Sequence, residues 1–195
     1  MKGRRVTPDL FSEPAESLQG YPAADVRRWI GCSLSGAVFD DTEKYRFTLW
    51  RRWIDECPVS RMVAFCGLNP STANAEKLDN TTKKCVKLSR SWGYDGFIML
   101  NLFAWRDTDP FAMKAVPDPI GYENDIVLAT VARSCGLFVC AWGTHGTHLD
   151  RNTSVRNLLA GNHVQAHCLA VTKDGHPKHP LFCRDSSQPI PYSLQ

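Results

Sequence analysis

Several features that would assign the chain to a common class are missing from its sequence. No apolar run is long enough to cross a membrane, and the first residues lack the apolar core of a secretory signal. None of the eight cysteines forms a Cys-x-x-Cys pair, the spacing that carries many zinc and iron–sulfur sites. We therefore expect a cytoplasmic protein with reduced cysteines and without a membrane partner or a metal.

No charge of one sign dominates either, because the formal net charge is only +3. Such a balance allows a nucleic-acid partner without requiring one, since the position of charge matters more than its sum. A chain of 195 residues, of which 43% are hydrophobic, is long enough to bury one core. Residues 1–20 are polar and aperiodic, so we expect a flexible arm there, followed by a single domain over residues 21–195 in a monomeric protein.

Four short apolar runs are the clearest structural signal in the sequence. They are MVAFC (62–66), FIMLN (97–101), LFVCA (137–141) and HCLAV (167–171). Such runs are typical of parallel strands that are buried on both faces. Helical patterns lie between the runs, and Asp79 or Asn80 can cap the first of them. The alternation predicts an α/β fold, a three-layer open sheet with a central four-stranded parallel core.

The segments before residue 62 are less regular. Apolar and polar residues alternate around 26–33 and 45–53, and turn residues occur in the connector SGAVFDDTEK between them. This pattern predicts either an antiparallel hairpin or a strand followed by a short helix.

Loops at the carboxyl ends of the four predicted strands are where a ligand is expected, because open parallel sheets bind ligands there. The loops are GLNPSTAN (67–74), NLFAWRDTDP (101–110), WGTHG (142–146) and TKDGHPKHPLF (172–182). Each is rich in glycine, proline, asparagine, histidine or aromatic residues.

The first loop can orient a polar group of a ligand. Gly67 allows close approach of the backbone, and Pro70 fixes the chain just after Asn69. The Asn69 amide can then hold a water or a carbonyl, although the same residues also form ordinary turns.

The second loop has the residue types that recognise a nucleotide. Asn101 presents a donor and an acceptor that match the edge of a pyrimidine, or else it caps loop backbone. Phe103 or Trp105 can stack on a base or complete the core, and Arg106 can meet a phosphate.

The last two loops contain His145, His176 and His179, which can donate hydrogen bonds or stabilise charge near neutral pH. A single loop histidine is usually a surface residue, but three at adjacent strand ends weaken that interpretation. No spacing among histidines, cysteines and carboxylates matches a known metal site.

Read in chain order, the four loops resemble the motif series of the uracil-DNA glycosylase superfamily. In that superfamily the first strand ends in Gly-x-Asn/Asp-Pro, which Gly67, Asn69 and Pro70 match. A later strand ends in Leu-Leu-Asn, to which Leu100 and Asn101 are similar. A third strand ends in Trp-Gly, as in WGTHG here.

The last motif of the series departs from the family pattern. The family has His-Pro-Ser-Pro-Leu, whereas HPKHPL here contains a second histidine, so that either His176 or His179 can be the functional residue. His179 is favoured, with Leu181 or Phe182 as the side chain that wedges into the duplex.

The resemblance implies a DNA glycosylase of base-excision repair that hydrolyses the N-glycosidic bond of a flipped, modified or mismatched pyrimidine. Asn69 would position the water, His179 would stabilise the anionic base, and Asn101 would select the base. The other implied contacts are with the substrate for Gly67, Pro70, Ser71, Phe103, Trp142, His145 and His176, and with DNA for Arg106, Lys173, Leu181 and Phe182. The first motif contains no lysine, so a Schiff-base lyase route is not indicated, and the implied reaction needs no cofactor.

The size of Ser71 affects which pyrimidine bases can fit the expected pocket. The uracil-specific branch has a tyrosine at this position, which excludes the methyl group of thymine, whereas serine leaves that space open. We therefore expect 5-substituted pyrimidines to fit. Two alternatives stay open: a nucleic-acid-binding protein of the same fold with lost or altered chemistry, and an enzyme that acts on free nucleotides or nucleosides.

Overall fold

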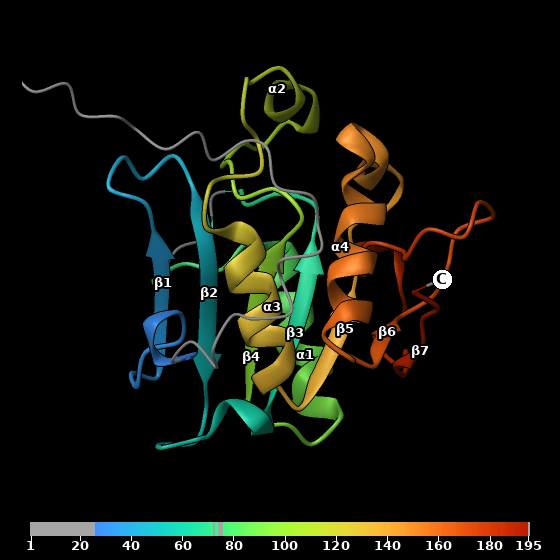
Figure 1. Ribbon diagram of the computed structural model, residues 1–195. Helices are drawn as coiled ribbons and strands as arrows, with labels where there is room; N and C mark the ends of the chain where they lie inside the picture. The colour runs from blue at the N-terminus through green and yellow to red at the C-terminus, as the bar shows by residue number, and fades with distance from the viewer. Residues whose placement is uncertain (1–25, 72, 74–75, 195) are drawn as a thin grey trace, which may run out of the picture.

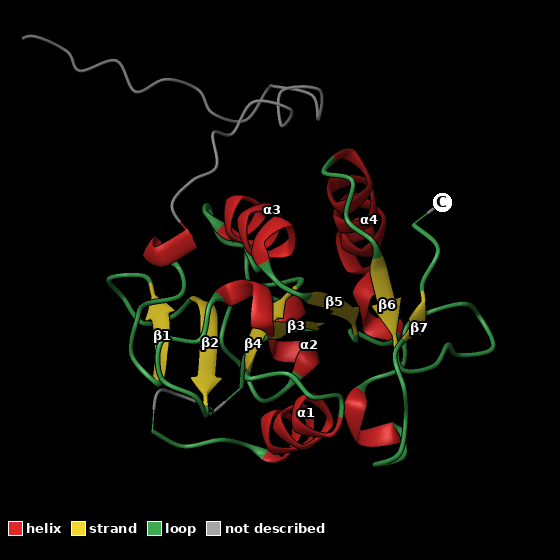
Figure 2. Ribbon diagram, turned by 90° about the horizontal axis from the view of Figure 1, so that it is seen from below, coloured by secondary structure: helices red, strands yellow, loops and turns green. Residues whose placement is uncertain are grey.

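The structure, a computed structural model, describes residues 26–71, 73 and 76–194, which form a seven-stranded sheet with helices on both faces (Figures 1 and 2). The strands are β1 (Ser35–Phe39), β2 (Arg46–Arg52), β3 (Met62–Gly67), β4 (Gly96–Asn101), β5 (Leu137–Cys140), β6 (Ala166–Cys168) and β7 (Ile190–Pro191). The helices are α1 (Asn80–Ser91), α2 (Pro110–Lys114), α3 (Asn124–Ser134) and α4 (Arg151–Gly161), and the 3₁₀ turns are η2 (Val26–Arg28), η3 (Val59–Arg61), η4 (Thr144–Asp150) and η5 (Pro180–Phe182). The arm expected over residues 1–20 lies outside the described residues. Within the described part of the chain, no helix has the length and apolar character needed to span a membrane.

The four predicted apolar strands form the centre of the sheet. Its order is β1-β2-β4-β3-β5-β6-β7, in which β4, β3, β5 and β6 are parallel neighbours. The outer strands β1, β2 and β7 each run antiparallel to their neighbours. The α/β class and its parallel core are therefore confirmed. Every residue of β3 and β4 is buried, which explains why neither strand alternates apolar with polar residues.

Successive residues of the central strands pack in two different cores. On β3, Ala64 and Cys66 belong to one core cluster, whereas Val63 and Phe65 belong to the other. The first cluster includes residues of α3 and α4, and the second includes residues of α1. Figure 2 shows α3 and α4 on one face of the sheet and α1 on the other, which is a three-layer arrangement.

The hairpin before the parallel core is present, but its first strand lies later than the sequence pattern predicts. β1 falls within the segment expected to be the connector, and residues 26–28 form the short turn η2. Trp29 and Ile30 follow η2 in an irregular segment and are each 1% exposed. Their burial gives the sequence a strand-like apolar pattern where no strand pairing exists, which is why the pattern places the strand too early.

The sheet brings the first two loops together at one edge. Gly67 and Asn101 are direct partners in the parallel register of β3 and β4, so the loops that follow them start side by side. β2 runs antiparallel to β4, and its first residue, Arg46, donates its backbone N–H to the carbonyl of Ala104 in the second loop. Arg46 therefore lies at the same edge as the ends of the parallel strands.

Candidate functional site

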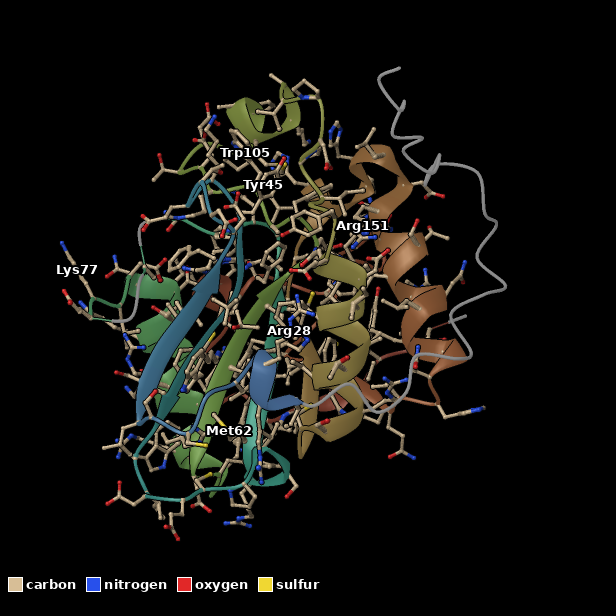
Figure 3. The ribbon with its side chains drawn as sticks, turned by 60° about the vertical axis from the view of Figure 1, so that its left-hand side comes forward. Arg28, Tyr45, Met62, Lys77, Trp105 and Arg151 are labelled. Carbon is tan, nitrogen blue, oxygen red and sulfur yellow. The ribbon has the colours of Figure 1, made fainter. Side chains whose placement is uncertain are left out.

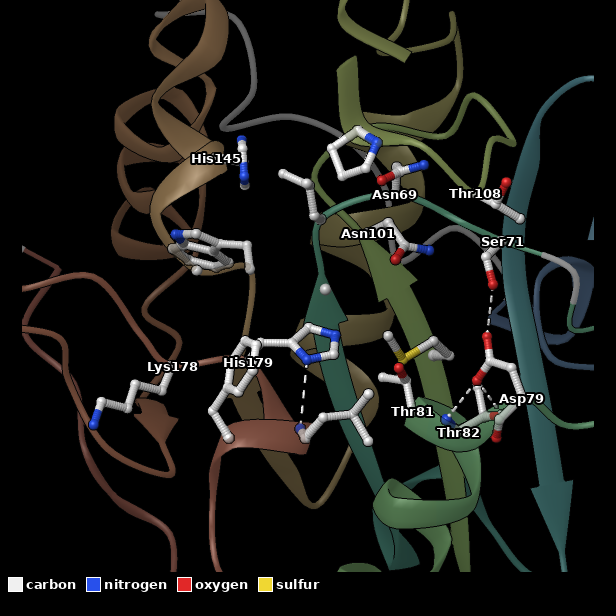
Figure 4. A pocket seen from close by; sticks show the side chains of 18 of the residues that line it. Asn69, Ser71, Asp79, Thr81, Thr82, Asn101, Thr108, His145, Lys178 and His179 are labelled. Atoms are coloured by element: carbon white, nitrogen blue, oxygen red, sulfur yellow. Dashed lines mark hydrogen bonds between the residues drawn. The ribbon is translucent and has the colours of Figure 1, made fainter. Parts of the chain in front are cut away.

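A cleft of about 780 Å³ opens at the carboxyl edge of the parallel strands (Figure 4). Residues from all four predicted loops contribute to its lining. The predicted site residues that line it are Gly67, Asn69, Ser71, Asn101, Trp142, His145, His179, Leu181 and Phe182. Its volume is within the range of about 300–1,000 Å³ that is common for small-molecule sites.

Five other predicted residues do not line the cleft. Pro70 is buried beside Asn69, and Phe103 is completely buried in the core. Arg106 lines a separate, smaller hollow. His176 and Lys173 lie in the tight turn before His179, so the structure places only the later of the two alternative histidines at the cleft.

Asn69 is held in one orientation by backbone carbonyls. Its Nδ2 donates to the carbonyl oxygen of Asp107 at 2.8 Å and lies 3.3 Å from that of Pro70. Because a carbonyl can only accept, these contacts identify the nitrogen side of the amide. Oδ1 is then the group that Asn69 can offer to a ligand, and it can accept a hydrogen bond from a water molecule.

Asn101 has a buried amide without a partner among the described residues. The residue is 2% exposed, and both its Oδ1 and its Nδ2 are buried and make no hydrogen bond within that part of the chain. Leaving a buried polar group unpaired costs about 1–3 kcal/mol, so native proteins rarely do so unless a ligand or water completes the site. The strand end itself is fixed, since Asn124 Nδ2 donates to the Asn101 carbonyl at 3.1 Å. The side chain is therefore well placed to bind a ligand in the cleft.

His179 presents one defined nitrogen. It caps η5, and its Nδ1 accepts the backbone N–H of Leu181 at 3.4 Å. Burial lowers the pKa of His179, although the nearby Asp79 carboxylate opposes this shift. The neutral imidazole with its proton on Nε2 is therefore the favoured form, and Nε2 is a hydrogen-bond donor.

This protonation state makes folding stability depend on pH. Because the folded pKa of His179 lies below its ordinary value of 6.5, the unfolded chain takes up the proton first as the pH falls. The contribution of His179 to stability is therefore present above pH 6.5 and decreases as the pH falls toward the folded pKa. We expect the drop in Tm between pH 7 and pH 5 to be smaller in His179→Asn, which retains a capping side chain, than in the wild type. An equal drop in Tm in both proteins would contradict the lowered pKa of His179 in the folded state.

The loop after β5 supplies a tryptophan and a second oriented histidine. Trp142 is 2% exposed and lines the cleft, and its Nε1 is buried without a partner. His145 Nδ1 lies 3.0 Å from the ammonium of Lys114 on α2. Lysine can only donate, so Nδ1 accepts and the proton of His145 is on Nε2. Both cleft histidines thus offer an Nε2–H group.

A polar wall opposite His179 was not expected from the sequence (Figure 4). The Asp79 carboxylate caps α1 and accepts hydrogen bonds from Thr82 N–H at 2.8 Å and from Ser71 Oγ at 2.8 Å. Although burial raises the pKa of Asp79, these hydrogen bonds and the nearby Arg46 hold it below its ordinary value. The Arg46 guanidinium is buried, and burial lowers its pKa to about 10. This wall therefore carries a negative charge on Asp79 and a positive charge on Arg46, and hydrogen bonds hold the Asp79 carboxylate in place.

The basic residues of α1 are largely engaged within the chain. Lys84 and Lys87 both pair with the carboxylate of Asp185. The guanidinium of Arg90 lies 4.5 Å from the ring centroid of Trp53. Lys84, Lys87 and Arg90 are therefore less available to a phosphate backbone.

The eight cysteines are all free thiols, and Cys32 is the exposed one. Within the described residues no cluster of three or more His, Cys, Asp or Glu side chains is placed to hold a metal ion. Burial raises the pKa of the Cys66 thiol to about 12, which makes the reactive thiolate scarce at neutral pH.

These burials predict the reactivity of the thiols. A disulfide reagent applied to the native protein is expected to modify Cys32 rapidly, and to reach all eight cysteines only after unfolding. Elemental analysis is expected to find no stoichiometric zinc or iron. One metal ion per chain, or fast modification of several thiols in the native state, would indicate that the cysteines have a functional role.

Comparison with known proteins gives one match. The model of a family described as "Protein of unknown function (DUF1643)" matches residues 46–181, a segment that begins at Arg46 and ends at Leu181. The matched segment includes every residue that lines the cleft except Phe182. No curated protein and no solved structure matches the chain.

Proposed function

The chain belongs to the DUF1643 family, and from the residues that line its cleft we propose that it is a DNA glycosylase that hydrolyses the N-glycosidic bond of a flipped pyrimidine. The observation that carries the proposal is the buried amide of Asn101, which has both a donor and an acceptor without a partner. The Watson–Crick edge of a pyrimidine has an N3–H or N3 position next to an exocyclic group, and it pairs with such an amide.

Figure 4 shows His179 and Ser71 on opposite sides of Asn101, which is the residue proposed to hold the base. With the base edge on Asn101, the Nε2–H of His179 can donate to the base oxygen next to the glycosidic nitrogen. That oxygen gains negative charge as the C1′–N bond breaks, because the bonding electron pair leaves with the base. A donor that is already oriented toward the developing charge lowers the barrier.

Asn69 is proposed to act in the second step, in which water attacks C1′ of the sugar. Its Oδ1 can accept a hydrogen bond from a water and so hold the water oxygen toward C1′ of the sugar. The water oxygen forms the new bond to C1′, and its proton leaves to solvent or to the departing base. An amide is not a base at neutral pH, so in this proposal Asn69 orients the water rather than deprotonating it.

The rim of the cleft supports a DNA substrate rather than a free nucleotide. Leu181 and Phe182 on η5 are 48% and 81% exposed, although both are large apolar side chains. Exposed apolar side chains beside a base pocket can fill the gap that a flipped nucleotide leaves in the stack. Arg106 and Lys173 remain the proposed contacts to the DNA backbone.

The test is base release from oligonucleotides. Duplex and single-stranded substrates carrying uracil, mismatched thymine or a bulky 5-substituted pyrimidine are incubated with the protein and scored for abasic sites. We expect at least one base to be released, and we expect the rate to fall with rising salt because the substrate is a polyanion. Failure to release any base, combined with salt-dependent binding to the same strands, would favour a binding protein over an enzyme.

A further inference from the structure

A second hollow adjoins the cleft behind Ser71. It has a volume of about 320 Å³ and shares Ser71, Asp107 and Thr108 with the cleft. These three residues border both spaces, so the shortest passage from the cleft to the second hollow runs past them. The other residues that line the second hollow are Glu43, Lys44, Trp105 and Arg106.

The walls of this hollow combine an aromatic ring with polar groups of both signs. Trp105 is held edge-on by Tyr45, with ring centroids 5.3 Å apart (Figure 3), and the Lys44 ammonium lies 5.9 Å from the Trp105 ring centroid. Arg106 donates to the carbonyl of Glu43 at 2.7 Å, whereas its Nε is buried and has no partner among the described residues. Arg106, which lines the hollow, thus carries one donor that the described part of the chain does not satisfy.

The passage between the two spaces lies on the C5 side of the proposed base. Figure 4 shows Ser71 and Thr108 on the side of Asn101 away from His179. If His179 binds the base oxygen next to the glycosidic nitrogen, the far side of the ring, which includes C5, faces Ser71. The Ser71 hydroxyl is tied to Asp79 at 2.8 Å, so the small side chain keeps a fixed position at the passage.

Resting on the proposed function, we propose that the second hollow is a subsite for a long, hydroxyl-bearing substituent at C5 of the target pyrimidine. A hydroxyl group can both donate and accept, which suits a hollow lined by two acidic residues, Glu43 and Asp107, and two basic ones, Lys44 and Arg106. The apolar face of a sugar-like group can pack on Trp105. The acidic and basic residues of the lining balance each other, so a neutral substituent fits the subsite better than a phosphate.

The experiment compares three oligonucleotides that differ in one base: uracil, 5-hydroxymethyluracil and its glucosylated form. We expect the wild type to release the glucosylated base at least about 10-fold faster than uracil, measured as kcat/KM. Thr108→Trp places a large ring at the passage and is expected to abolish this preference. Thr108→Ser is the matched control and should retain it. Thr108 is exposed, so neither change should prevent folding, which thermal unfolding checks.

The outcomes separate this inference from the proposed function. Release of uracil with equal or slower release of the glucosylated base would overturn the subsite and leave the glycosylase proposal standing. An unchanged preference in Thr108→Trp would also overturn it. If the wild type releases no base, the glycosylase proposal fails, and binding affinities for the same three strands decide the subsite: tighter binding of the glucosylated strand supports it, and equal binding refutes it.

Discussion

Replacement of Asn69 by alanine is expected to slow base release by about 100-fold or more and to leave DNA affinity close to that of the wild type. The amide oxygen that would hold the water is lost, and removal of one positioned catalytic group commonly has an effect of this size. The groups proposed to bind the base, Asn101 and His179, are unchanged. Single-turnover release and binding to an uncleaved strand measure the two effects separately.

The control for Asn69→Ala must account for its hydrogen bond to the Asp107 carbonyl. Loss of such a bond costs about 1 kcal/mol, which shifts Tm by roughly 2–4 °C in a chain of this size. Asn162→Ala is the control, because Asn162 Nδ2 also donates to a backbone carbonyl, that of Leu158 at 2.7 Å, away from the cleft. Its Oδ1 also accepts from Arg133 at 2.8 Å, so this variant should lose at least as much stability as Asn69→Ala and keep full activity. Equal activity of Asn69→Ala and the wild type would reject the water-positioning role.

The parallel core could be predicted from the sequence because burial on both faces leaves a simple signal. β3 and β4 contain no exposed residue, so their apolar runs have no interruption and mark the strands directly. The edge strands carry no such signal. β1 is half-buried, and β7 is a two-residue strand that is exposed throughout, so that pairing in the folded chain defines them rather than local composition.

The cleft could be predicted in part because parallel strands end at the same edge. That rule identifies Asn69, Asn101 and His179, which follow or end three different strands of the core. It misses Arg46, because β2 is antiparallel and reaches the same edge with its first residue. Asp79 is predicted as a helix cap, and it lies in the cleft wall because the crossover helix α1 starts at the carboxyl edge of β3.

The aromatic residues of the second loop show a further limit of sequence patterns. Phe103 and Trp105 are both possible stacking residues from the sequence, two positions apart in one irregular segment. In the structure Phe103 is completely buried, whereas Trp105 is half-buried and lines the second hollow. The difference depends on the path of the loop, which is set by hydrogen bonds between Trp105 and the Pro119 carbonyl and between Phe103 and the Leu68 carbonyl. Neither contact is local in the sequence.

Replacement of Gly67 by alanine is expected to reduce base release by about 10- to 100-fold with little loss of stability. The new Cβ would lie 2.7 Å from Met99 Cε and 3.0 Å from Asn101 Oδ1. The end of the methionine can swing away, but Asn101 must move by a few tenths of an ångström, and a small displacement of a positioning group is costly for catalysis. Gly67 is not among the glycines with positive φ, so alanine is not strained there.

The Gly67→Ala measurement separates a displaced Asn101 from a damaged fold. Single-turnover rates and affinity for the free base should both fall, while thermal unfolding stays within a few degrees of the wild type. Gly161→Ala is the matched control, because a Cβ at the end of α4 would meet no atom within 4 Å, and full activity is expected. Gly67 lines the cleft, and its new Cβ would press on Asn101, so wild-type activity in Gly67→Ala would mean that the Asn101 amide does not hold the base.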